Sequence, residues 1–163
     1  PCVELQAKGE QPVKVVYAVE GTIFPGESVQ IIKGAPHMEN AKNRTGYRYY
    51  IMPKEEKGKI IGTIGLNNVV WGIFLSCFMG YMLDEAYINR GYMTQAVDAV
   101  ANTAFNEIGL HRIEANIMPK NARSLRVAEK CGFVREGMSK KYLCINGVWE
   151  DHVHMVKLNE NME

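Results

Sequence analysis

The chain of 163 residues is long enough for one well-packed domain and short for two, so we expect a single domain over residues 1–163. Its 19 basic and 18 acidic residues nearly cancel, so the net charge gives no overall attraction to nucleic acid or an anionic membrane, and any anion site must be local. The four cysteines form no C-x-x-C pair, and neither a signal peptide nor a membrane-spanning run is visible. We therefore expect a cytoplasmic protein with reduced, mostly buried thiols, no metal site, and no membrane or direct nucleic-acid partner.

The first part of the chain predicts strands. VKVVYAV (13–19) and SVQIIKG (28–34) are candidates for short strands, although glycine and proline interrupt residues 1–45 and no helix is predicted there. After that, YRYYIM is typical of a strand, KEEKGK of a hairpin turn and KIIGTIGL of the next strand. Asn67 and Asn68 indicate a turn, after which VVWGIFLSCFMGYML supplies one or two further strands. The turn spacing predicts an antiparallel meander.

The hydrophobic period then changes to that of a helix. Apolar residues between Met93 and Ile108 recur at intervals of three and four, and Gly109 marks the end of this helix. RIEANIM (112–118) alternates like a strand. Because the first helix leaves the carboxyl end of a strand, it lies where open sheets tend to bind ligands.

The last part of the chain predicts a second helix and a hairpin. The helix runs from about residue 121 to 130, with Leu125 and Ala128 on its inner face and Gly132 as its cap. FVREGMSKKYL and VWEDHVHMVKL are strands joined at Asn-Gly, which is a strong hairpin signal. The order of elements predicts an α/β or α+β sheet.

The stretch INRGYMTQAV (88–97) places a glycine directly before the first helix. The first N–H groups of that helix have no carbonyl partner, and a phosphate would satisfy them in the field of the helix dipole. Arg90 would add a charge-assisted contact to such an anion. The alternative is that water or a side chain satisfies these groups and Gly91 only forms the turn. The stretch is neither a P-loop nor a dinucleotide fingerprint.

The stretch NARSLRVAEKCGFVREG (121–137) opens the second helix. Asn121 and Ser124 are explained locally as capping residues of its first turn. Together with GYML, INRGYMTQA and the terminal NGVWED, this stretch resembles the GNAT superfamily of acyl-CoA-dependent N-acetyltransferases over roughly residues 47–158. More narrowly, it is similar to the branch that acetylates the N-terminal amine of ribosomal proteins, together with the uncharacterised relatives of that branch.

The resemblance implies an α/β (α+β) domain with a mixed, mainly antiparallel central sheet, flanking helices and a splayed strand at the coenzyme A site. Residues 1–45 match poorly. It also implies acetyl transfer from acetyl-CoA by direct attack of a primary amine, most simply a ribosomal or other protein N-terminus. A polyamine or aminoglycoside acceptor, a non-catalytic acyl-CoA-binding domain, a related fold that binds no coenzyme A, and a homodimer are left open.

The resemblance assigns residues to the coenzyme A site. The family pattern Q/R-x-x-G-x-G/A holds the pyrophosphate with backbone N–H groups; Gly91 matches its central glycine, whereas Ile88 and Met93 depart from it. The backbone at the end of the preceding strand pairs with pantetheine like an added strand. The implied cofactor-binding residues are Met82, Leu83, Asn89, Arg90, Gly91, Tyr92, Met93, Thr94 and Asn121.

Ser124 is the catalytic residue that the resemblance implies, as the hydrogen-bond donor to the departing thiol. Ala128 stands where many family members have an acidic tyrosine, and the glutamate of the ribosomal-protein branch falls on Leu143. The attacking amine must lose a proton, so a base is needed. The candidates are Glu114, Glu150, Asp151, His152 and His154, several of which the strand alternation places on an exposed face. The aromatic residues Tyr47, Tyr49, Tyr50, Trp71 and Trp149 either line an acceptor pocket or pack on the sheet.

Overall fold

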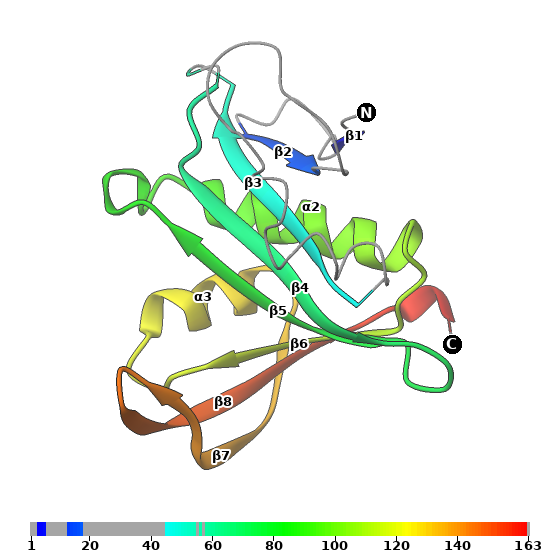
Figure 1. Cartoon of the computed structure of the whole chain (residues 1–163), viewed down its shortest axis with the longest axis vertical. Helices are drawn as coiled ribbons and strands as arrows, with labels where there is room; N and C mark the ends of the chain where they lie inside the picture. The colour runs from blue at the N-terminus through cyan, green and yellow to red at the C-terminus, as the bar shows by residue number, and fades with distance from the viewer. Residues whose placement is uncertain (1–2, 6–12, 18–44, 55, 57, 163) are drawn as a thin grey trace.

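The computed structural model describes residues 3–5, 13–17, 45–54, 56 and 58–162. Within these residues, eight strands form one sheet in the order β1-β2-β3-β4-β5-β6-β8-β7 (Figure 1). The strands are β1 (Val3–Leu5), β2 (Val13–Tyr17), β3 (Tyr47–Pro53), β4 (Gly62–Val70), β5 (Ser76–Leu83), β6 (Arg112–Ile117), β7 (Val134–Ile145) and β8 (Val148–Leu158). The helices are η1 (Glu85–Tyr87), α2 (Tyr92–Asn106), α3 (Ala122–Lys130) and η2 (Glu160–Met162). The strand predicted at 28–34 lies outside the described residues.

The sheet splits between β5 and β6. All the other described neighbours pair antiparallel, but these two strands run parallel and share a ladder only from Ser76 opposite Arg112 to Phe78 opposite Glu114. Beyond that point β5 continues to Leu83 and β6 to Ile117 without a common ladder. The expected mixed, mainly antiparallel sheet with a splayed strand is confirmed.

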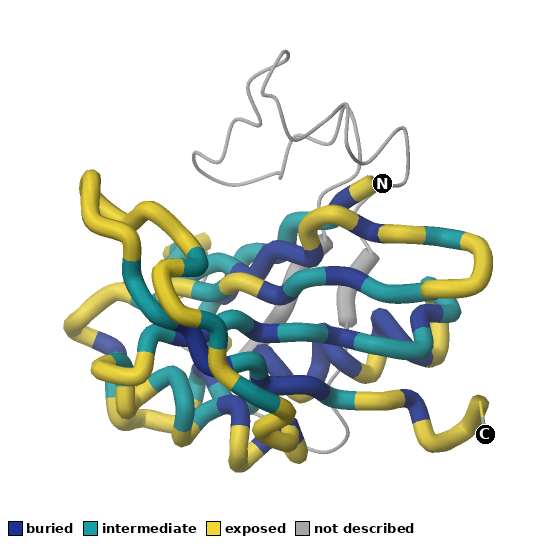
Figure 2. Tube along the Cα trace, turned by 90° about the horizontal axis from the view of Figure 1, so that it is seen from below, coloured by how far each residue is buried: buried dark blue, intermediate teal, exposed yellow. Residues whose placement is uncertain are grey.

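Alternation along the strands gives the sheet two different faces. Ile113, Ala115 and Ile117 of β6 are buried in the core that the strands form with α2 and α3. Arg112, Glu114 and Asn116 alternate with them and project to the opposite side, together with their β8 partners Val156 and His154. We call these two sides the helix face and the polar face. Figure 2 shows the buried residues concentrated along the central strands, with exposed residues in the connecting loops.

The predicted turn at Asn67 and Asn68 is wrong. β4 continues through both residues to Val70, with a register shift between Asn67 and Val70. Asn68 has a φ of 51°, a left-handed conformation that asparagine tolerates. The same tolerance that suggested a turn allows a β-bulge at this position. The chain turns instead at 71–75, where Gly72 has a φ of 75°.

The predicted helices are confirmed, and both pack on the helix face. Met93, Ala96, Val97, Val100, Ala101, Ala104 and Phe105 of the predicted apolar stripe are all buried on α2. α3 begins where Asn121 caps it, with the Asn121 Oδ1 accepting a hydrogen bond from the Ser124 N–H at 3.1 Å. The α3 side is tied to α2 by the Cys131 thiol, whose Sγ lies 3.3 Å from the Thr94 carbonyl oxygen. Because Cys131 is the C-cap of α3 and Thr94 lies in the first turn of α2, this contact joins the end of α3 to the start of α2.

The thiols of the described residues are free. Cys77 and Cys131 are buried, which raises the pKa of Cys77 to about 12 and that of Cys131 to about 11. The expectation of mostly buried thiols agrees with Cys77 and Cys131, whereas Cys144 is exposed on β7 beside the hairpin turn; Cys2 lies outside the described residues. In the described ranges, no metal-ligand cluster is present, and no helix is long and apolar enough to cross a membrane.

Candidate active site

A pocket of about 660 Å³ opens on the helix face where β5 leaves β6. The end of β5, the loop before α2, the first turn of α2 and one side of α3 enclose it. Of the residues expected to bind the cofactor or to act in catalysis, those that line it are Met82, Leu83, Asn89, Gly91, Tyr92, Met93, Thr94, Asn121 and Ser124. Segments separated in the sequence by a helix and a strand thus meet at one cavity.

Arg90 differs from the other predicted residues because it is not part of the pocket lining. Its guanidinium carbon lies 5.3 Å from the centroid of the Tyr87 ring, a cation–π distance, and Tyr87 itself lines the pocket. Tyr87 is fixed in turn, since its hydroxyl donates to the Glu56 carboxylate at 2.8 Å. Arg90 therefore contacts a residue of the pocket wall, Tyr87, but does not line the pocket itself.

Gly91 is the N-cap of α2 and has a φ of 81°. A β-carbon at this position would be strained, and glycine avoids that cost. Gly91 has no side chain that could cap the helix, and the first helical hydrogen bond runs from the Gln95 N–H to its carbonyl oxygen at 3.1 Å. The N–H groups of Tyr92, Met93 and Thr94 precede that bond and have no acceptor within the helix, and all three residues line the pocket. This turn provides main-chain donors and a positive dipole end for an anion.

Positive charge reaches the same pocket from α3. Arg123, Arg126 and Lys130 line it, at intervals of three and four residues that place them on one side of the helix. The sequence analysis did not single them out. Their spacing in NARSLRVAEK was the available signal, because it is the spacing of one helical face. Guanidinium and ammonium groups around a helix N-terminus suit a ligand with several phosphates.

Tyr81 is a second residue that the sequence analysis missed. Its hydroxyl donates a hydrogen bond to the Ser124 carbonyl oxygen at 3.0 Å, and both residues line the pocket. Burial raises the pKa of Tyr81 to about 12, so the phenol stays protonated at neutral pH. The alternation of Cys77, Met79 and Tyr81 on β5 was the available signal, since it directs all three to the helix face.

Ser124 sits in the first turn of α3 with its main chain held at both ends. Its N–H donates to Asn121 and its carbonyl oxygen accepts from Tyr81. Among the described residues, its hydroxyl has no hydrogen-bond partner and remains available to a ligand. The Asn121 cap uses only the side-chain oxygen, so the amide NH₂ of Asn121 is also available as a donor.

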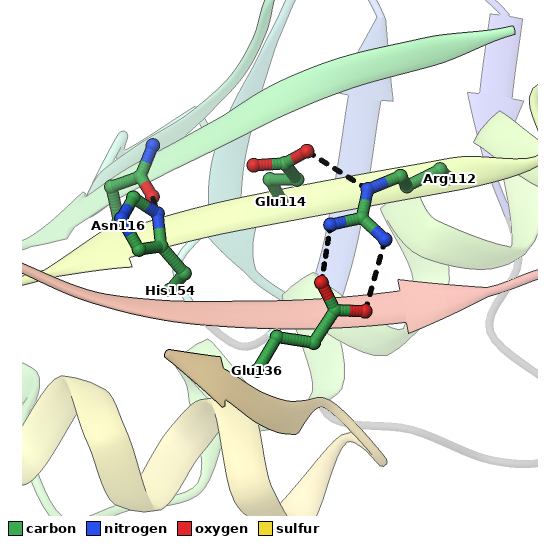
Figure 3. Close-up of polar contacts among 5 residues, drawn as sticks. All are labelled: Arg112, Glu114, Asn116, Glu136 and His154. Carbon is green, nitrogen blue, oxygen red and sulfur yellow. Dashed lines mark hydrogen bonds and ion pairs between the residues drawn. The ribbon is translucent and has the colours of Figure 1, made fainter. Parts of the chain in front are cut away.

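The candidate bases lie outside the pocket lining. Figure 3 shows Arg112 between Glu114 and Glu136, with Nε of Arg112 2.8 Å from Glu114, and shows Asn116 facing His154. The three acidic candidates are all paired: Glu114 with Arg112, Glu150 with Lys120, and Asp151 with the Lys141 N–H, from which it accepts a hydrogen bond. The Nδ1 of His152 lies 3.0 Å from the Glu150 carbonyl oxygen. His154 lies between Asn116 and Ser139. His152 is buried and 3% exposed, so it is not one of the residues on the exposed strand face that was expected for several of these candidates.

The candidate acceptor aromatics do not line the pocket formed by the described residues. Tyr49 is fully buried in the core, Tyr47 and Trp71 pack against that core, Tyr50 is partly buried on β3, and Trp149 is exposed on β8. Sheet packing, one of the two expectations for these residues, accounts for Tyr47, Tyr49 and Trp71.

Comparison with known proteins agrees with this geometry. Residues 11–134 match the acetyltransferase (GNAT) domain family. The probable N-acetyltransferase YjcK of Bacillus subtilis (strain 168) is 48% identical over 105 residues, which cover 64% of this chain and 58% of YjcK. The structure of ribosomal-protein-S5-alanine acetyltransferase from Vibrio fischeri matches with a TM-score of 0.73 and 37% identity, over 78% of this chain and 69% of that one. Mycobacterium smegmatis RimJ in complex with CoA-disulfide matches with a TM-score of 0.71 and 29% identity, over 76% and 58%.

The chain thus spans just under 60% of YjcK and of the RimJ chain. The matched region contains the split sheet, the glycine-capped α2 and the basic side of α3. GNAT acetyltransferases use acetyl-CoA, and main-chain N–H groups at a helix N-terminus suit its pyrophosphate. A split sheet beside a glycine-capped helix, in a chain that matches the family over most of its length, identifies this chain as a member of the GNAT acetyltransferase family.

Proposed function

We propose that this chain transfers the acetyl group of acetyl-CoA to a primary amine, most simply the N-terminal amine of a protein, by direct attack in a ternary complex. The observation that carries the proposal is the single pocket in which the free N–H groups of α2, the basic side of α3 and the Ser124 hydroxyl meet. The likeness to the S5-alanine acetyltransferase of Vibrio fischeri supports a protein N-terminus as the acceptor. One continuous sheet and core in the described residues support a single domain.

The phosphate end of acetyl-CoA is assigned to the junction of α2 and α3. The main-chain N–H groups from Asn89 to Thr94 bind the pyrophosphate, and Arg90 lies close enough to add long-range attraction. Arg123, Arg126 and Lys130 neutralise the remaining phosphate charge from the other wall. The departures at Ile88 and Met93 are tolerated because the principal donors are main-chain groups.

The pantetheine end is assigned to the split. On the side of β5 that faces away from β4, Met82 and Leu83 have no strand partner among the described residues, so their main-chain groups can pair with an extended arm. The Asn121 amide adds a donor from α3. Ser124, held by Tyr81 and Asn121, then donates its hydroxyl proton toward the departing thiolate.

The test is release of free coenzyme A thiol from acetyl-CoA in the presence of amines. The panel contains peptides that begin with Ala, Ser, Thr or Met, together with a polyamine and an aminoglycoside. Peptide-dependent thiol release supports the proposal, and Ser124→Ala should lower kcat while leaving acetyl-CoA affinity unchanged. Preference for the polyamine or the aminoglycoside identifies a small-molecule acetyltransferase. Acetyl-CoA binding without thiol release from any amine identifies a non-catalytic binding domain and overturns the proposal.

A further inference from the structure

Two contacts show which end of α3 meets which part of the pocket. At the start of α3, the Ser124 carbonyl oxygen accepts a hydrogen bond at 3.0 Å from the Tyr81 hydroxyl of β5, the strand that borders the split. At the end of α3, the Sγ of the C-cap residue Cys131 lies 3.3 Å from the Thr94 carbonyl oxygen in the first turn of α2. In the proposed function, the start of α3 is therefore the thioester end of the pocket, and the last turn of α3 is the phosphate end.

Three cationic side chains line the pocket along this direction. Arg123 lies in the first turn of α3, whereas Lys130 is the last residue of the helix. Arg126 precedes Lys130 by four residues, a spacing at which side chains are neighbours on a helix surface. Arg123 and Lys130 are about 10 Å apart along the helix axis, since each residue adds about 1.5 Å. Arg126 and Lys130 thus belong to the phosphate end, and Arg123 belongs to the thioester end.

None of these three cations forms an ion pair within the part of the chain that the structure describes. The cations that flank α3 are different, because the fold holds both of them. Lys120, in the turn before α3, pairs with Glu150, and Lys157, next to Gly132, pairs with Asp98. The first turn of α3 contains no acidic residue, although the helix dipole favours one there. The charge of this pocket wall is therefore not explained by the stability of α3 and indicates an anionic ligand.

The positive charge of the wall exceeds what a pyrophosphate requires. The first turn of α2 already offers free N–H groups and a positive dipole end to that group. Coenzyme A carries a further phosphate, a monoester on the 3′ oxygen of its ribose, and such a monoester has a charge of about −1.5 to −2 at pH 7. This phosphate is at the end of the coenzyme that is remote from the thioester. Two neighbouring cations at the phosphate end of the pocket match its charge.

We infer that Arg126 and Lys130 form a subsite for the 3′-phosphate of coenzyme A, which makes the protein select 3′-phosphorylated acyl donors. The inference rests on the proposed function and names the class of donor that the same pocket accepts. A guanidinium can donate two parallel hydrogen bonds to phosphate oxygens, and an ammonium adds a compact charge beside it. Arg123, at the thioester end, does not distinguish donors by this group. Dephospho-coenzyme A and a phosphopantetheine arm on a carrier protein both lack the 3′-phosphate, so their thioesters are poor donors.

The test compares the Kd of coenzyme A with that of dephospho-coenzyme A, which differ only in this phosphate, by isothermal titration calorimetry. The wild-type protein should bind dephospho-coenzyme A about tenfold or more weakly, the loss expected for two partly exposed contacts to a charged group. In the double variant Arg126→Ala, Lys130→Ala, the coenzyme A Kd should rise until the two Kd values differ by less than about twofold. Arg123→Ala should weaken both ligands by the same factor and keep their ratio.

Two further variants separate the subsite from net charge and from helix stability. Arg135→Ala, Lys140→Ala removes the same charge from exposed positions outside the pocket lining and should leave the ratio of Kd values unchanged. Lys130 also complements the C-terminal end of the α3 dipole, so the melting temperature of each variant is measured as well. Arg126→Gln, Lys130→Gln keeps long side chains without the charge and should abolish the selectivity as the alanine variant does.

Equal Kd values for the two ligands in the wild-type protein would overturn the subsite and leave the proposed function standing. A ratio that the double variant does not change, or that the control variant lowers equally, would also overturn it. Absence of acetyl transfer to any amine, with the selectivity for coenzyme A intact, would overturn the proposed function alone. Failure of the wild-type protein to bind either ligand would overturn both.

Discussion

The two faces of the split sheet are built from different kinds of chemical group. On the helix face, the pocket uses main-chain N–H groups and a basic helix side, each supplied by one short continuous segment. On the polar face, His154 contacts Asn116 and Ser139, which are 38 and 15 residues away from it in the sequence. The first kind of site tolerates substitution, since a backbone donor survives a change of side chain. The second kind depends on each side chain and on the strand register.

The largest effect is expected on the helix face from removing its charge. The triple variant Arg123→Ala, Arg126→Ala, Lys130→Ala should raise the Kd for acetyl-CoA by about 100-fold, because each partly exposed phosphate contact contributes on the order of 1 kcal/mol. Isothermal titration calorimetry at two salt concentrations measures it, and the salt dependence should fall with the charge. A matched control, Lys54→Ala, Arg135→Ala, Lys140→Ala, removes the same charge from exposed positions outside the pocket lining. Equal losses in both variants would show that net charge, and not this wall, governs binding.

Gly91→Val should weaken acetyl-CoA binding by about tenfold. A β-branched residue resists the φ of 81° at this position. Keeping this φ costs about 1–2 kcal/mol of backbone strain, and abandoning it displaces the first turn of α2. The Kd measures the effect, and Gly109→Val, which carries the same strain at a φ of 80° outside the pocket lining, is the control for stability. Unchanged binding by Gly91→Val would mean that the first turn of α2 does not hold the ligand.

Gly80→Leu separates the two faces directly. A side chain there fills the open space on the polar face, so the KM for the peptide should rise several-fold, by roughly 1 kcal/mol or more of lost binding. The Kd for acetyl-CoA on the other side should stay within twofold. Steady-state kinetics and calorimetry together measure both quantities. If acetyl-CoA affinity falls and the peptide KM does not, the acceptor approaches from elsewhere.

A smaller effect is expected for Tyr81→Phe. The variant loses the 3.0 Å hydrogen bond to the Ser124 carbonyl oxygen, which contributes about 1 kcal/mol to stability. The free energy of unfolding in urea should fall by that amount, and kcat should fall a few-fold because Ser124 is held less firmly. Tyr142→Phe, which keeps the ring against His154, is the comparison. A loss of stability without any change in kcat would confine Tyr81 to a packing role.

The smallest effect concerns Glu136 and pH. The Arg112 guanidinium lowers the pKa of the Glu136 carboxyl below its usual 4.5, so this pair adds stability above that pH and loses it as the pH falls through the lowered value. Glu136→Gln should melt slightly below the wild-type protein at pH 7, and the difference should shrink as an acidic pH protonates Glu136. Thermal melts at both pH values measure it. A difference that persists or grows in acid would show that Glu136 acts through packing and not through its charge.

The pocket could be predicted from sequence to a large extent because its parts are local. A glycine before a helix, Asn121 as a cap and Ser124 three residues later are short-range patterns, and the fold brings them together as expected. Tyr81 was harder to find, since its role depends on which face of β5 meets α3. The basic side of α3 was visible in the spacing and was not used.

The polar face was predictable only in part. His154 was one of five candidate bases, and alternation along β8 could not distinguish it from His152, which is buried. The register that sets Asn116 opposite His154 and brings Ser139 alongside depends on pairing among β6, β8 and β7. Such register is a long-range property of the folded sheet. The turn expected at Asn67 and Asn68 failed for a related reason, since a left-handed asparagine suits a bulge as well as a turn.

The split between β5 and β6 has a further consequence for the stability of the protein. An extended ligand arm between the strands would supply the missing edge partner, so the ligand would act as part of the sheet. Amide hydrogens of Met82 and Leu83 should then exchange more slowly with solvent when acetyl-CoA is bound. Unfolding would also require release of the ligand, which adds RT ln(1 + [L]/Kd) to the stability. The concentration of acyl-CoA around the protein would thereby set the free energy of unfolding of the sheet as well as the rate at which the protein turns over substrate.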